Sequence, residues 1–465
     1  ISVDGNMIIS GITTLGTTSF TADATVNSVT VGKGANSVTG NTALGESALD
    51  AANSGSGNNT AIGNGVLTEN TSGNHNAAVG KGSLAANTTG SANSAVGAFA
   101  LDANTTANSN SAFGYSALTS NTTGAQNTGI GRNALHDNST ASNNTAVGYD
   151  AMNANTTGTN NAAVGANALR LNTTASDNTA VGYNALTTNT TGSNNTVVGS
   201  QSGDAITTGS NNTAIGDRSL TTLTTGSNNT ALGVQSLNSN ETSGDNTALG
   251  FQALMNHTAT GAVAIGKDAM RANTTGGQNT AIGMDALTSN TTGAANVAIG
   301  YAAAINQNAN YSVIIGDRAA GSGTLTGDHN TFIGHYSGYV ASTAQRNTSL
   351  GSNSFAGLTT GDDCTALGYN TLAANTTASD NTAVGKNALA ANTTGAQNTA
   401  VGKDALDANT TAHDNTAMGV GALGVMNGGL GKNCAFGNYS GDAITTGGSN
   451  NCFGYQAGTA ITTGS

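Results

Sequence analysis

Several residue types are missing or scarce in this chain of 465 residues. It has no proline and no tryptophan, and only 8% of its residues are charged. Proline has no backbone N–H, so its absence suits a fold in which nearly every N–H donates to a neighbouring strand. Scarce charge has a matching reason, because a charge at a fixed position of a stacked repeat would face its own copy at about 4.8 Å. These absences favour a stacked β structure, with a disordered low-complexity chain as the alternative.

A short motif of the type Asn-Thr-Ala-Val-Gly recurs along the chain and argues against disorder. Its glycine, called the repeat glycine below, occurs 25 times between Gly45 and Gly454. Of the 24 intervals, 19 are 17 residues long, three are 18 and two are 16. A unit this short buries too little surface to fold alone, so neighbouring units must stack into one continuous core.

Each unit has two positions that are regularly large and apolar. The residue before the repeat glycine is always Val, Ile, Leu, Phe or Met, and the residue four positions after it is Leu or Met in 18 of the 25 copies. Neither segment is long enough for a helix, so we expect two short buried strands per unit. The Asn-Thr-Thr-Gly runs, such as residues 87–90 and 189–192, predict turns. Each unit should form one coil of an all-β parallel β-solenoid with about 25 coils of 17 residues.

The thinness of each coil predicts self-association. A coil holds two large apolar side chains and a few alanines, whereas ordering the chain costs about 1.5 kcal/mol per residue. Association of three chains through their alanine and valine faces would supply the missing apolar area. We therefore expect an elongated homotrimer whose coils, rising about 4.8 Å each, form a rod on the order of 120 Å long.

The repeat resembles the head repeat of trimeric autotransporter adhesins of the YadA type. The residues that carry the resemblance are the repeat motif and variants such as Asn296-Val297-Ala298-Ile299-Gly300, and they cover the chain from about Asn41 to its end. The resemblance implies a left-handed parallel β-roll that is a tight homotrimer. This chain departs from the adhesin motif in carrying Thr, in most copies, where the motif has an inward Val, and in its longer period.

The segment before the repeats resembles what precedes them in bacteriophage tail fibres. It runs from Val3 to Thr39 and includes residues 5–11, Gly-Asn-Met-Ile-Ile-Ser-Gly, and residues 29–34, Val-Thr-Val-Gly-Lys-Gly. Such fibres are trimeric, and their shafts carry adhesin-like repeats. The final residues, 461–465, match residues 206–210, which continue into a further coil, so we expect the chain to be part of a longer polypeptide.

The spacing divides the chain into four segments. We predict an entry segment at 1–40, regular coils at 41–300, irregular coils at 301–363 and further coils at 364–465. In the irregular segment the spacing changes to 16 and then 18, and aromatic and basic residues gather. They form a candidate receptor-binding site for host polysaccharide or a fibre component, and the alternative is a packing irregularity. The candidate site residues are Tyr311, Arg318, His329, His335, Tyr336, Tyr339 and Arg346.

The sequence shows no pattern of catalytic or metal-binding residues. The serines lack a partnered base, and of the six histidines only His329 and His335 lie near each other. We predict no enzyme activity, no cofactor and no metal site. The net charge of -12 argues against nucleic acid as a partner, and no stretch is suited to membrane insertion. Cys364, Cys434 and Cys452 are expected to be free thiols, the last two on opposite faces of their strands.

These features together predict a structural protein. The primary expectation is a phage tail-fibre shaft, located in the virion, which presents a host-recognition tip and contacts itself, other tail or fibre proteins and host-surface polysaccharide or protein. The alternative is the head of a trimeric adhesin on a bacterial outer surface. An ice-binding solenoid is a remote third possibility, because its flat Thr-x-Thr face differs from Thr-Thr pairs that sit at turns.

Overall fold

The computed structural model describes residues 23–51 and 57–464, which form an all-β parallel β-solenoid of about 24 turns with a spacing of about 17 residues. The chain divides into two compact units, Ile1–Asn160 (unit 1) and Asn161–Ser465 (unit 2). The parallel stacking and the period that the sequence predicts are confirmed. Residues 5–11, on which part of the entry-segment prediction depends, lie outside the described residues.

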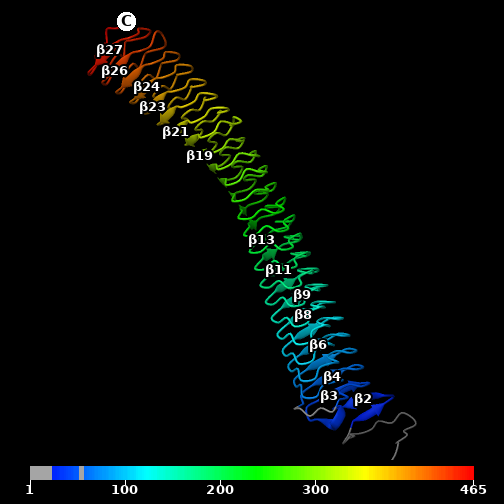
Figure 1. Ribbon diagram of the computed structural model, residues 1–465. Coiled ribbons are helices and arrows are strands. Elements are labelled where there is room, and N and C mark those ends of the chain that lie inside the picture. The colour runs from blue at the N-terminus through cyan, green and yellow to red at the C-terminus, as the bar shows by residue number, and fades with distance from the viewer. Residues whose placement is uncertain (1–22, 52–56, 465) are drawn as a thin grey trace, which may run out of the picture. The chain divides into compact units, whose positions relative to one another are not determined.

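Unit 1 opens with antiparallel strands and continues as a parallel stack (Figure 1, blue to cyan). Strand β2 (Val29–Gly32) pairs antiparallel with β1 (Ala24–Val26) on one side and with β3 (Thr42–Gly45) on the other. A single turn of 3-10 helix, η1 (Ala35–Ser37), connects β2 to β3. From β3 onward each strand pairs in parallel with the next. These strands are β4 (Thr60–Ile62), β5 (Ala77–Val79), β6 (Ser94–Val96), β7 (Ser111–Phe113), β8 (Thr128–Ile130) and β9 (Thr145–Val147).

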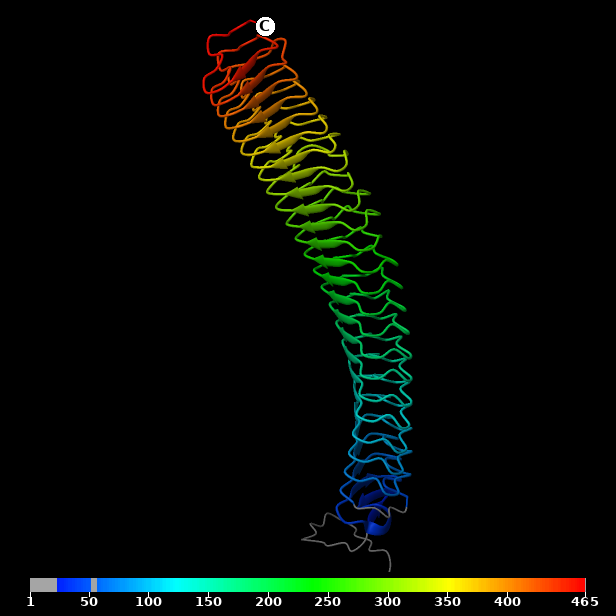
Figure 2. The ribbon, with the colours of Figure 1, turned by 60° about the vertical axis from the view of Figure 1, so that its left-hand side comes forward.

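Unit 2 contains only parallel pairings between successive strands, and Figure 2 shows its strand arrows following one another along one side of the stack. Its strands are β10 (Ala162–Val164), β11 (Thr179–Val181), β12 (Thr196–Val198), β13 (Thr213–Ile215), β14 (Thr230–Leu232), β15 (Thr247–Leu249), β16 (Val263–Ile265), β17 (Thr280–Ile282), β18 (Val297–Ile299), β19 (Val313–Ile315), β20 (Thr331–Ile333), β21 (Thr348–Leu350), β22 (Thr365–Leu367), β23 (Thr382–Val384), β24 (Thr399–Val401), β25 (Thr416–Met418), β26 (Cys434–Phe436) and β27 (Asn451–Phe453).

Each coil has one strand, three residues long from β4 onward, and the face of the strand that is buried differs from the prediction. The middle residue, usually alanine, is buried, as at Ala95 and Ala231. The large apolar residue before the repeat glycine was expected inside, but it points outward with the first strand residue, because side chains alternate along a strand. The interior is already filled by the leucine four positions after the glycine, so only a small residue fits opposite it. The alanine face is therefore the core, and it is not available for association between chains.

The second predicted strand is a turn. In the coil that follows Gly182, Asn184 has φ 54° and Leu186 has φ 51°, a left-handed conformation that no strand contains. Leu186 is nevertheless buried, and its N–H donates to the carbonyl of Ser202 in the next coil at 3.0 Å. Leucine and methionine tolerate this conformation better than Val and Ile, which branch at Cβ. The described copies accordingly have Leu, Met, Phe, Ala or Gly at this position, and never Val or Ile.

Two columns of buried asparagines run through the interior beside the leucines. One column lies four residues before the repeat glycine, and the other lies seven residues after it. In the second column, the side-chain N–H of Asn87 donates to the side-chain oxygen of Asn70 at 2.9 Å and to the carbonyl of Gly90 at 3.0 Å. In the first, the backbone N–H of Asn93 donates to the side chain of Asn76 at 3.0 Å. We call these hydrogen-bonded columns the asparagine ladders. They provide partners for buried polar groups, whose burial without a hydrogen bond would cost free energy.

Replacements in the columns keep either the hydrogen bonding or the volume. Cys364 takes an asparagine position, and its sulfur accepts from the N–H of Asn381 at 3.4 Å. In a different arrangement, Gly203 replaces the usual leucine while Ile206 replaces the usual asparagine. A Cβ on Gly203 would lie 3.0 Å from Cδ1 of Ile206, so the isoleucine fills the space that a leucine fills elsewhere.

Candidate functional site

The seven predicted site residues fall into two groups on different corners of the coil. The first group, Tyr311, His329 and Arg346, occupies the position five residues before a repeat glycine, which we call the pre-strand corner. The ring of Tyr311 stacks on that of His329, with 5.1 Å between the ring centroids and an interplanar angle of 9°. Arg346 Nε and Nη2 donate to the two oxygens of Asp363 at 2.7 and 2.9 Å. This pairing lowers the pKa of the Asp363 carboxyl from its ordinary value and neutralises the guanidinium.

The second group contains Arg318, His335, Tyr336 and Tyr339 and follows the strand. Arg318 Nη1 donates to the hydroxyl of Tyr336 at 3.0 Å, which raises the pKa of the guanidinium. The ring of Tyr336 lies 4.0 Å from that of His335 and 4.7 Å from that of Tyr339, measured between centroids. The four predicted residues therefore lie together.

Sequence reasoning missed two members of the second group. The guanidinium of Arg318 lies 5.2 Å from the ring centroid of Tyr301, and His335 Nε2 lies 3.4 Å from a carboxylate oxygen of Asp317. Tyr301, Asp317 and His335 each stand directly after a repeat glycine, so their alignment could have been found by placing the units one under another. Between the two groups, the outward face of β19 and β20 presents Ile315 and Ile333, both half-exposed.

The position of the second group is shared by many aromatic and basic residues. We call the first and second positions after a repeat glycine the post-glycine corner. These two of 17 positions hold eight of the ten tyrosines and seven of the twelve lysines and arginines. The second position has positive φ in most copies, for example 50° at Arg318 and 54° at Tyr336. Aromatic and basic side chains therefore recur along this corner, and Arg318, His335 and Tyr336 of the second group are part of it.

The outward face of the strands forms an exposed apolar strip within each unit. In unit 1 the residues before successive repeat glycines include Val96, Phe113 and Ile130, which are 39, 41 and 41% exposed. In unit 2 the strip includes Leu232, Leu249 and Leu350. Such a row of partly to fully exposed apolar side chains is unusual on a monomer and is typical of an interaction surface.

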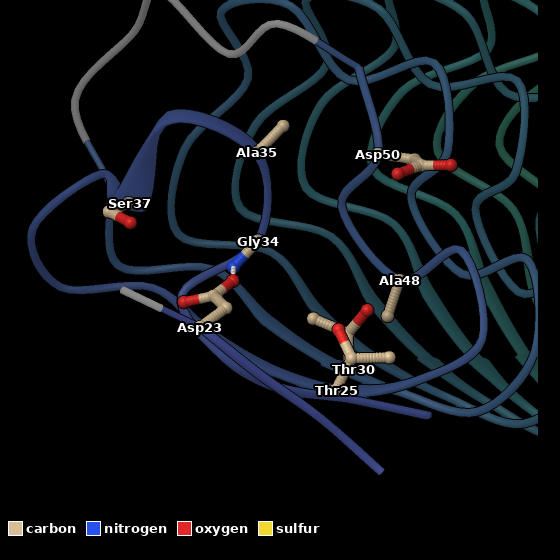
Figure 3. Close-up of a pocket in the computed structure, with 8 residues that line it drawn as sticks. All are labelled: Asp23, Thr25, Thr30, Gly34, Ala35, Ser37, Ala48 and Asp50. Carbon is tan, nitrogen blue, oxygen red and sulfur yellow. Dashed lines mark hydrogen bonds between the residues drawn. The ribbon is translucent and has the colours of Figure 1, made fainter. Parts of the chain in front are cut away.

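A polar hollow of about 340 Å³ lies at the start of unit 1 (Figure 3). Asp23 has a structural role, because its two carboxylate oxygens accept hydrogen bonds from the backbone N–H groups of Lys33 at 2.7 Å and Gly34 at 2.6 Å. Figure 3 shows Asp50 on another side of the hollow, apart from Asp23. The arrangement anchors the loop after β2.

The remaining reactive groups are separated from one another. Within residues 23–51 and 57–464, no three His, Cys, Asp or Glu side chains lie close enough to hold a metal ion, and His329 and His335 lie in different groups. All three cysteines are free. Burial raises the pKa of the Cys364 thiol to about 11. Cys434 is half-exposed and Cys452 is buried, which confirms the prediction that they occupy opposite faces of their strands.

Comparison with known proteins gives no family. No protein-family model matches the chain, and neither does any curated protein. In the part of the chain that the structure describes, no helix has the length and apolar character needed to cross a bilayer.

Proposed function

We propose that this chain is the shaft of a trimeric fibre, with a phage tail fibre as its setting and the virion as its location. The observation that supports this is the apolar strip on the outward face of the strands, exemplified by Leu232 and Leu249. Burial of such a strip contributes about 25 cal/mol per Å², which offsets the thin interior of each coil. The chain would then act as an extended arm that carries a host-recognition tip, in contact with other tail or fibre proteins.

In this proposal the chain is a left-handed parallel β-roll that forms a tight homotrimer, like the YadA-type head repeats that the sequence resembles, and no enzyme activity or cofactor is required. The two groups around Tyr311 and Tyr336 would contribute to attachment to host polysaccharide or protein. Their rings and cations flank the half-exposed face of β19 and β20, which gives a surface of mixed apolar and polar character.

The alternative proposal, the head of a bacterial trimeric adhesin, requires the same fold and the same association. An antibody against the chain separates the two, because it would label fibres of purified virions in one case and bacterial surfaces in the other. Ice binding is less well supported. The outward face combines one row of mostly threonine with a row of Val, Ile, Leu, Phe or Met, whose unequal sizes do not make a flat surface.

Association is tested by the mass of the folded particle, measured by native mass spectrometry. We expect a mass of three chains for the unchanged protein and a smaller mass for the double variant L232K and L249K, because charges would be buried in the strip. The matched control is T225K with T242K, two exposed residues of the same coils on the Asn-Thr-Thr-Gly side. A monomeric unchanged protein would rule out the trimeric shaft.

A further inference from the structure

Unit 1 carries a second row of aromatic and basic side chains, apart from the predicted site in unit 2. Lys81, Phe99, Tyr115, Arg132 and Tyr149 occupy the post-glycine corner of five successive coils, and we call them the unit 1 ribbon. Each contacts the next. Lys81 Nζ lies 5.8 Å from the ring centroid of Phe99, whose ring meets that of Tyr115 edge to face at 6.0 Å. The guanidinium carbon of Arg132 lies 5.9 Å from the Tyr115 ring centroid and 5.8 Å from that of Tyr149.

The rings of the ribbon are accessible. Tyr115 is 52% exposed and Tyr149 is 49% exposed, and Phe99 is half-buried. Because neighbouring coils are about 4.8 Å apart, the two tyrosines are about 10 Å apart along the stack, with the arginine between them. Two exposed tyrosine rings at the same repeat position, with a cation between them, offer apolar faces at a spacing that suits an extended polymer lying along the stack.

The two cations of the ribbon are not neutralised by the protein. Among the residues that the structure describes, no carboxylate forms an ion pair with Lys81 or Arg132. In unit 2, by contrast, Lys267 and Lys403 pair with the carboxylate of the following residue at 2.9 and 3.2 Å. The guanidinium of Arg132 lies between two rings and has N–H groups that can donate to a planar anion such as a carboxylate.

Unit 1 has few cations, so their position in the ribbon indicates which class of ligand the ribbon suits. Residues 1–160 contain only three lysines and arginines against eight aspartates and glutamates, and two of the three cations are in the ribbon. A surface for nucleic acid requires a dense positive field along a phosphate backbone, which this unit lacks. Isolated cations beside aromatic rings, Lys81 next to Phe99 and Arg132 between Tyr115 and Tyr149, fit a polymer whose units each have an apolar ring face and a spaced carboxylate.

We propose that the unit 1 ribbon binds a linear acidic polysaccharide built of uronic acids. The C–H faces of the sugars pack on Tyr115 and Tyr149, and a sugar carboxylate accepts from Arg132, with Lys81 holding a second carboxylate further along the polymer. The ribbon lies within one chain, so the proposal does not require the trimer. It adds a binding surface and a ligand class to those of the proposed fibre.

The test is a titration of the full chain with fluorescently labelled oligogalacturonate. The substitution R132Q removes the charge and is expected to weaken binding about tenfold, since a hydrogen bond between charged groups contributes about that much. Y115A is expected to weaken binding by a similar factor. The matched control is Y183A, because Tyr183 occupies the same corner with 55% exposure but its neighbours along the column are Ala166 and Ser200. This control should bind as the unchanged chain does.

Further arms identify the ligand class. The fully methyl-esterified polymer, which has no carboxylates, should not bind, and added salt should weaken binding of the acidic form. The proposal is overturned if the acidic oligomer does not bind, if R132Q binds as tightly as the unchanged chain, or if a thymidylate oligomer binds more tightly in an Arg132-dependent manner. Native mass spectrometry of each variant reports assembly separately, so that loss of glycan binding and loss of the trimer are distinguished.

Discussion

The side-chain N–H of Asn87 donates to the side-chain oxygen of Asn70, which lies 17 residues earlier, at 2.9 Å. The same bond recurs from Asn104 to Asn87 at 2.8 Å and from Asn121 to Asn104 at 3.1 Å. A thin coil with few large apolar residues thus uses amide side chains as part of its core.

The first prediction concerns this ladder. Asn121 donates to Asn104 and to the carbonyl of Gly124, and it accepts from Asn138. N121A leaves these buried groups short of partners and should lower the free energy of unfolding by about 2–3 kcal/mol. Denaturant unfolding measures the change. T123A, at an exposed residue of the same turn, should change it by less than about 0.5 kcal/mol. Equal effects of the two variants would contradict a structural role for the ladder.

The second prediction concerns the exchange of positions at Gly203 and Ile206. I206N removes a buried aliphatic side chain. Because Gly203 stands where other coils have leucine, no other side chain fills the space, and the free energy of unfolding should fall by about 2–4 kcal/mol. The triple variant V197A, G203L and I206N restores the pattern of the other coils, because Val197 stands where most coils have alanine and its side chain would lie 3.3 Å from a Cβ on Gly203. It should recover most of that loss, since leucine takes the same positive φ elsewhere. Thermal and denaturant unfolding of the single and triple variants check this. A triple variant no more stable than I206N would mean that the isoleucine does not substitute for the leucine.

The third prediction concerns His257, which replaces a ladder asparagine. Its ring is buried, and Nδ1 accepts from the side chain of Asn273 at 3.0 Å. Burial lowers the pKa of His257 from 6.5 to about 4. In the unfolded chain the imidazole of His257 is therefore protonated as the pH falls below about 6.5, whereas in the folded chain it is protonated only as the pH falls below about 4. The contribution of His257 to the free energy of unfolding is fully present above pH 6.5, and about 3 kcal/mol of that free energy is lost as the pH falls to 4.

The variant H257N provides the control for this pH dependence. It restores the ladder and removes the titrating group, so the difference in unfolding free energy between it and the unchanged chain should grow as pH falls from 6.5 to 4. A difference that stays constant over this range would show that His257 is not buried in its neutral form.

The fourth prediction concerns the repeat glycines. Gly182 has φ 136°, and a Cβ there would overlap the carbonyl of Gly199 in the next coil. G182A should therefore destabilise the chain by about 3 kcal/mol or more. The control is G65N, because Gly65 has φ 66°, has open space around it and occupies a position where other copies have asparagine. Circular dichroism during thermal unfolding should show a large shift for G182A and little change for G65N.

The sequence predicts the period, the parallel stacking and the turn runs, because these follow from the regular spacing of glycine and of Asn-Thr-Thr-Gly. It does not show directly which side of the strand is buried. Three residues such as Thr179, Ala180 and Val181 can place either the alanine or the two larger residues inside, and the decision depends on how much space Leu186 leaves. The positive φ of the leucine column was visible only as the absence of Val and Ile.

The candidate site was predicted in part for a similar reason. Composition reveals the gathering of Tyr336, Tyr339 and Arg346, but only the position within the repeat shows which of them can meet. Tyr336 and Tyr339 follow the same strand and their ring centroids lie 4.7 Å apart, whereas Arg346 precedes the next strand and pairs with Asp363. The unit 1 ribbon does not appear as a cluster in the linear sequence, because its members are 16 to 18 residues apart.

The side-chain amides of the asparagine ladders also have aligned dipoles in each unit. The bonds between asparagine side chains run from the nitrogen of one coil to the oxygen of the coil before it, as from Asn87 to Asn70 and from Asn93 to Asn76. The amide dipoles are thus aligned head to tail, and each polarises its neighbour and strengthens the next bond. Where Ile206 interrupts the row, the oxygen of Asn189 has no hydrogen-bond partner. The two ends of an uninterrupted row therefore differ, because its first coil leaves an amide nitrogen without a partner, as at Asn41, whereas its last coil leaves an amide oxygen.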